Sequence, residues 1–160
     1  MKKLLNHFEE YLSCLVFMVM LALAFVNVIF RNFAASISFT EEITTSLFVL
    51  LCMLGTSIAA RDQGHLGLSV VTEFLSEKKR LWFSVGGNLL GVIFSAILFY
   101  TGIGMVVTEY VMGQISIALQ WPQWIYGSFL PFGAFCMILR FAQAAARNLT
   151  TILHLKEEHK

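Results

Sequence analysis

Charged residues are scarce in this chain. Of its 160 residues only 13% are Asp, Glu, Lys or Arg, whereas 58% are apolar and the mean hydropathy is +0.74. A soluble domain of this composition would expose large apolar patches to water. The composition therefore excludes an ordinary soluble protein and predicts an integral membrane protein that meets lipid. The net charge of +1 provides no strongly basic surface, so no nucleic-acid partner is expected.

The sequence also lacks the residues that several kinds of membrane enzyme need. It has no GxxxxGK[ST] phosphate-binding loop, which excludes a built-in ATPase. Its four histidines lie outside the apolar runs, so helix-borne haem ligands are missing. Its three cysteines lie inside apolar runs and form no CxxC pair, which argues against a thiol oxidase. We therefore predict no enzymatic activity, no cofactor and no metal site.

Four apolar runs are long enough to cross a bilayer. They cover residues 11–30, 43–60, 81–107 and 122–140. About 18 residues at about 1.5 Å each already approach the thickness of the hydrocarbon core. The first run, at about twenty residues, is longer than the apolar region of a signal peptide, so we expect a retained span. The fold class predicted is a single all-α membrane domain over residues 1–160, with four transmembrane helices.

The segment between the second and third runs, residues 61–80, is too short and too polar to span a membrane. Its apolar residues recur at helical spacing from Leu66 to Leu75. This pattern is typical of a helix lying in the membrane interface. We expect one short interfacial helix here.

Basic residues are distributed unevenly along the chain. Ten of the eleven Lys and Arg residues lie in the start, the central loop and the C-terminal region, and the other two loops hold only Arg31. Because basic residues favour the cytoplasmic side, this asymmetry predicts four spans with both termini in the cytoplasm.

Three charges surround the first polar link. Arg31 closes the first run, and Glu41 and Glu42 open the second. The first turn of a helix favours carboxylates and the last turn favours cations. A local role at the helix ends and a contact with a partner both explain these charges, and the sequence leaves both open.

A row of small residues, Gly87, Gly91 and Ser95, lies in the third run. Small residues at this spacing let another helix approach closely. The partner is either the second run, at Gly55 and Ala59, or a helix of another subunit. The short loop between the second and third runs favours the internal pairing.

The fourth run carries aromatic and proline residues at its start. Trp121 and Trp124 suit a membrane–water boundary. Pro131 cannot donate a hydrogen bond to the carbonyl of Gly127, which predicts a kink. Arg140 is expected near the end of this span, and the interior of every span is uncharged. A proton-coupled antiporter normally carries an ionisable residue there, so these spans are expected to be structural and to serve a partner.

The order of these features resembles the small membrane subunit of tripartite ATP-independent periplasmic (TRAP) transporters, over nearly the whole chain. The matching pieces are Arg31, Glu41–Glu42, Leu54–Gly55 with Arg61 and His65, Pro122–Trp124, Pro131 and Arg140. Phe39 stands where a tryptophan is expected before the glutamates, and one aromatic replaces another.

The resemblance implies a transport role in the bacterial inner membrane. The small subunit would enlarge the static scaffold of a large membrane subunit, which carries substrate and sodium ions. A periplasmic substrate-binding protein would dock on the pair. Substrates across the family are organic acids such as C4-dicarboxylates and sialic acids, and the stretch MLGTSIAARDQGH is more similar to the sialic-acid members.

The sequence bears on two alternative functions. A small multidrug-type exporter requires a buried carboxylate in a span, and none is expected. An assembly factor for another membrane complex is not excluded by the sequence. The candidate contacts with a partner are Arg31, Glu41, Glu42, Arg61, His65, Gly87, Gly91, Trp121, Trp124 and Arg140.

Overall fold

The computed structural model describes residues 2–33, 38–62 and 77–157. They form the helices α1 (Lys2–Phe33), α2 (Ser38–Arg61), α4 (Glu77–Val111), α5 (Gln123–Gly127) and α6 (Phe129–Glu157). Within these residues there is no β-strand, which confirms the predicted all-α class. The segment expected to form the interfacial helix falls mostly outside the described residues.

Four stretches are long and apolar enough to cross a membrane, as predicted. They are His7–Arg31, Ser38–Arg61, Leu81–Val111 and Gln123–Ile152. The last of these combines α5 with most of α6. It extends well past residue 140, where the fourth apolar run was expected to end, because Ala-rich and amphipathic sequence continues the helix.

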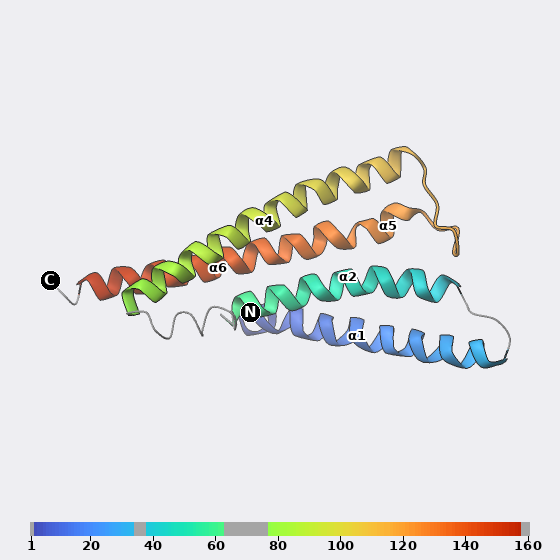
Figure 1. Cartoon of the computed structure of the whole chain (residues 1–160), viewed down its shortest axis with the longest axis horizontal. Coiled ribbons are helices and arrows are strands. Elements are labelled where there is room, and N and C mark those ends of the chain that lie inside the picture. The colour runs from blue at the N-terminus through green and yellow to red at the C-terminus, as the bar shows by residue number, and fades with distance from the viewer. Residues whose placement is uncertain (1, 34–37, 63–76, 158–160) are drawn as a thin grey trace.

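The helices lie side by side in one layer (Figure 1). α1 packs on α2, α2 on α6, and α6 on α4, so that α1 and α4 form the two edges. Figure 1 looks down the shortest axis of the molecule, along which the layer is thin. Because the layer is one helix thick, the described helices enclose no central passage.

The two ends of the layer differ in what they contain. The start of α1 and the end of α6 lie at one end, called here the terminal end (Figure 1). The end of α1, the start of α2 and the loop of residues 112–122 between α4 and α5 lie at the other, called the hairpin end.

Apolar packing in the middle of the layer centres on α2 and α6. Leu50 and Leu54 of α2 pack with Val16 of α1 and Cys136 of α6. Outside such contacts the helices present many exposed Phe, Leu, Ile and Val side chains. Exposed apolar side chains over whole helices suit lipid rather than water.

The row of small residues on α4 packs within the chain, but its predicted partner is wrong. A Cβ atom added at Gly91 would lie 2.6 Å from the Phe141 ring of α6. A Cβ atom added at Gly55 would meet nothing within 4 Å. The reason is the order of the layer, in which α6 lies between α2 and α4. Ser95 is fully buried, and its hydroxyl donates to the Gly91 carbonyl at 2.7 Å.

The interruption expected at Pro131 lies at Ser128, where α5 ends and α6 begins. The proline sits in the first turn of α6, where its missing N–H leaves no helical bond broken. Ser128 N–H still donates to the Trp124 carbonyl at 3.0 Å, so α5 and α6 continue in nearly the same direction (Figure 1).

Candidate subunit-interaction surface

A buried ion pair joins the first and last helices near the terminal end. Arg140 Nε of α6 donates to Glu9 Oε2 of α1 at 2.9 Å and to Oε1 at 3.0 Å. The two side chains are only 8% and 7% exposed. Ser57 of α2 donates to Glu9 Oε1 at 3.1 Å, and Arg140 Nη1 donates to the Gln143 amide oxygen at 2.9 Å. The pair is therefore hydrogen-bonded from three helices, as a buried charge pair requires.

A second charged group lies beside it, closer to solvent. Arg61, at the end of α2, donates to Glu10 of α1 and, at 2.8 Å, to Asp62 Oδ1. Its backbone carbonyl accepts from Arg147 Nη2 of α6 at 2.7 Å. The hydrogen bond from Arg61 holds the pKa of the Asp62 carboxyl below its ordinary value. Together these contacts tie α1, α2 and α6 at the terminal end.

At the hairpin end, Glu42 binds the loop of residues 112–122. Its Oε2 accepts from the Ser116 hydroxyl and, at 3.4 Å, from the Ala118 N–H. Ser116 is buried, and its N–H donates to the Trp121 carbonyl at 2.8 Å. Glu42 therefore connects α2 to a loop that is more than 70 residues away in sequence.

A second carboxylate at this end is also buried. Glu109 of α4 is 6% exposed, and its Oε2 has no hydrogen-bond partner among the described residues. It lies against Gly127 of α5, where any Cβ atom would overlap that oxygen. Residue 127 must therefore be small for α5 to pack on α4 here.

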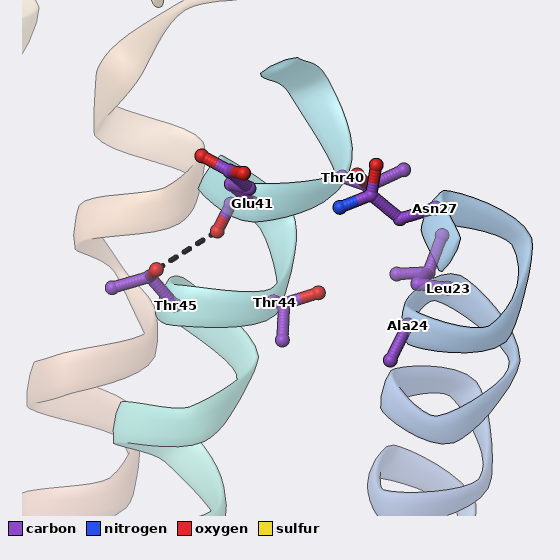
Figure 2. A pocket seen from close by; sticks show the side chains of 7 residues that line it. All are labelled: Leu23, Ala24, Asn27, Thr40, Glu41, Thr44 and Thr45. Atoms are coloured by element: carbon purple, nitrogen blue, oxygen red, sulfur yellow. Dashed lines mark hydrogen bonds between the residues drawn. The ribbon is translucent and has the colours of Figure 1, made fainter. Parts of the chain in front are cut away.

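A cavity of about 370 Å³ opens between α1 and α2 near the hairpin end. It is lined by Leu23, Ala24, Asn27, Thr40, Glu41, Thr44 and Thr45 (Figure 2). Figure 2 shows the Asn27 and Thr44 side chains between the two helices, and the Glu41 side chain directed away from α1. The lining of the cavity therefore combines apolar side chains with amide and hydroxyl groups. Among the described residues, no His, Cys, Asp and Glu side chains cluster into a metal site.

The ten residues predicted as partner contacts have different surroundings. Four make contacts within the chain, namely Glu42, Arg61, Gly91 and Arg140. Four have exposed side chains, namely Arg31, Glu41, Trp121 and Trp124. Gly87 is half-buried on α4, and His65 lies outside the described residues.

The interior of every span was expected to be uncharged, but the spans bury the charged residues Glu9, Glu109 and Arg140. Glu9 was assigned to a polar lead before the first span, but α1 begins at Lys2 and carries Glu9 into the layer. Arg140 was expected near the end of a span, but α6 continues to Glu157 and places it inside the helix. One signal was available, since an acidic residue at the start of the first span and an arginine late in the fourth meet if successive spans are antiparallel.

The comparisons with known proteins agree with this architecture. Residues 12–151 match the family of the DctQ component of tripartite ATP-independent periplasmic transporters. The chain belongs to the DctQ family. The members of this family are non-enzymatic components of TRAP transporters, and the four long apolar helices fit a multi-pass membrane protein. The chain spans less than two thirds of the length of the first curated relatives that it matches.

Several relatives carry TRAP names. The chain is 29% identical over 156 residues to the sialic acid TRAP transporter permease protein SiaT of Haemophilus influenzae (strain 86-028NP), covering 93% of this chain and 24% of that protein. It is 30% identical over 105 residues to the C4-dicarboxylate TRAP transporter small permease protein DctQ of Rhodobacter capsulatus, covering 66% and 46%. It is 26% identical over 149 residues to the ectoine TRAP transporter small permease protein TeaB of Halomonas elongata, covering 92% and 77%.

Proposed function

We propose that this DctQ-family chain is the scaffold subunit of a sodium-driven importer. In this proposal it binds a large membrane subunit in the bacterial inner membrane and works with a periplasmic substrate-binding protein. Both chain termini face the cytoplasm. The large subunit moves substrate and sodium, and this chain broadens the part of the complex that stays fixed.

The observation that carries this proposal is the single-layer arrangement of the helices. The buried ion pair of Glu9 and Arg140 connects α1 and α6, the two helices that pack on α2. An ionisable residue in a span usually faces a bundle interior or a water-filled path. Since this layer encloses neither, a substrate path belongs to another subunit.

The buried carboxylates bear on the alternative of a multidrug-type exporter, which needs such a group. Glu9 is paired with Arg140 and hydrogen-bonded by Ser57, so it acts as a structural ion pair. Glu109 lies at the end of α4, against Gly127. These placements favour the scaffold function.

We propose an organic acid as the substrate of the assembled transporter, with sialic acid the first to test. The sialic acid permease matches this chain over 156 residues. The C4-dicarboxylate and ectoine relatives have similar sequence identities to this chain. These two compounds are therefore the necessary comparisons in any transport assay.

The surface proposed to meet the large subunit includes the exposed residues at the hairpin end of α1 and α2. Arg31 and Glu41 lie on either side of the link between these helices, next to the cavity lined by Asn27 and Thr44. Because surface charges beside a membrane guide pairing more than they add affinity, these two are expected to specify the partner.

Co-purification tests the proposal. The tagged chain is expressed with a large TRAP membrane subunit, extracted in mild detergent and purified through the tag, and the retained proteins are identified by mass spectrometry. Stoichiometric recovery of the large subunit is expected. Recovery of the tagged chain without the large subunit, under conditions in which both are folded, would reject the scaffold function.

A further inference from the structure

The loop of residues 112–122 presents apolar side chains outward at the hairpin end. Ile117 is 97% exposed and Ile115 is 63% exposed, and Trp121 is also exposed. The whole loop contains no Asp, Glu, Lys or Arg. A connection of this kind in water would normally be polar, so this surface requires an apolar environment.

The loop is held in one shape by its own hydrogen bonds. Gln123 N–H donates to the Gln114 carbonyl at 2.9 Å, and Gln120 N–H donates to the Ser116 carbonyl at 3.1 Å. Ile115 forms an antiparallel bridge with Pro122. The apolar side chains are therefore displayed from a fixed backbone.

Ser116 and the two isoleucines beside it differ in direction. In an extended segment successive side chains point to opposite sides. Ser116 points inward and is bound by Glu42, whereas its neighbours Ile115 and Ile117 are exposed. The contact that fixes the loop thus turns both isoleucines away from α2.

The depth of the loop follows from its contact with Glu42. The helix between Glu42 and Arg61 is about 28 Å long at about 1.5 Å per residue, close to the thickness of the hydrocarbon core. With Arg61 at one boundary, Glu42 lies at the other, and Ser116 and Ala118 lie at the same level.

Aromatic residues mark the same level. The Tyr110 and Trp124 rings, at the two ends of the loop, pack edge to face with centroids 6.0 Å apart. Tyrosine and tryptophan gather where the hydrocarbon core meets the headgroups.

We propose that this loop is a lipid anchor, which inserts Ile115, Ile117 and Trp121 into the leaflet at the hairpin end. Lipid is the occupant that fits the observations, because the exposed surface is apolar, uncharged and continuous with the apolar surface of α4. The anchor is a property of this chain and does not depend on the large subunit or on the transported substrate.

The test uses an environment-sensitive fluorophore. The native cysteines Cys14, Cys52 and Cys136 are replaced by alanine, Ile117→Cys is introduced, and the thiol is labelled with an NBD dye. The full chain is placed in lipid nanodiscs containing a headgroup spin-labelled lipid. Because Ile117 is almost fully exposed, its replacement should not disturb the fold.

Gln114→Cys, at an exposed polar residue of the same loop, is the matched control. The dye at residue 117 should emit at shorter wavelength than at residue 114, with several-fold weaker quenching by aqueous iodide and stronger quenching by the spin-labelled lipid. Equal iodide quenching at the two positions would overturn the lipid anchor. Shielding of residue 117 that appears only with a large subunit, without lipid quenching, would overturn it in favour of a protein contact.

Discussion

Glu9 and Arg140 are 131 residues apart in sequence and form a buried ion pair across the thin layer of helices. The pair lies where α1 and α6 approach each other beside α2, and Ser57 completes it. Removing one charge from such a pair leaves the other buried and uncompensated, which is much more destabilising than removing both.

Arg140→Leu is therefore expected to lower the free energy of unfolding by about 3–5 kcal/mol. The double variant Glu9→Leu with Arg140→Leu should recover most of this loss, because no charge remains buried. Thermal unfolding in detergent measures the stability of the single and the double variant. Arg31→Leu, which removes an exposed arginine in the last turn of α1, is the control and should change stability little. A double variant as unstable as Arg140→Leu would contradict this role of the pair.

The adjacent carboxylates Glu41 and Glu42 allow a matched comparison at the hairpin end. Both lie near the start of α2, Glu41 in the first turn and Glu42 directly after it, but only Glu42 binds Ser116 and Ala118. Glu42→Ala should cost about 1–2 kcal/mol of stability for the lost charge-assisted hydrogen bonds, and Glu41→Ala should cost less. Hydrogen exchange should accelerate at the amides of the loop in Glu42→Ala alone. Equal exchange in the two variants would mean that Glu42 does not hold the loop.

Gly91→Leu tests the contact between α4 and α6. Its side chain would overlap the Phe141 ring and force the helices apart, with an expected loss of about 1–3 kcal/mol. Gly104→Leu on the same helix meets nothing within 4 Å and should leave stability unchanged or higher, since glycine is a poor helix former. Thermal unfolding of the isolated chain distinguishes them. If Gly91→Leu is as stable as Gly104→Leu, the packing described for α4 is wrong.

The proposed orientation predicts which ends can be labelled from outside the cell. A cysteine replacing Gln114 should react with an impermeant thiol reagent added to the periplasmic side. A cysteine replacing the exposed Asp62, at the terminal end, should not react until the membrane is permeabilised. Labelling of residue 62 in intact inner membranes would show that the chain is inserted the other way round.

Much of this fold could be predicted from hydropathy alone. The four spans follow from the apolar runs, because each run is long enough to cross the hydrocarbon core and a helix satisfies its own backbone hydrogen bonds there. The ends of the helices were harder to predict from the sequence. The sequence after Arg140 is polar enough to suggest the end of a span, but its alanine-rich stretch continues α6 to Glu157.

Which helices touch could not be derived from the runs. The row of Gly87, Gly91 and Ser95 indicated a close helix contact, but small residues do not identify their partner, and α6 rather than α2 lies against them. The contacts of the charged residues were equally hard to predict. Glu42 fits the helix dipole so well that its contact with Ser116, more than 70 residues later, could not be read from local sequence.

Transport by purified components tests the central claim most directly. The chain is reconstituted into liposomes with a sodium gradient, alone or with the large subunit and the substrate-binding protein, and uptake of labelled sialic acid, C4-dicarboxylate and ectoine is measured. We expect no uptake by the chain alone, because its single layer of helices encloses no passage, and sodium-dependent uptake of one organic acid when all three components are present. Sodium-dependent uptake by the chain alone would contradict its assignment as a scaffold subunit.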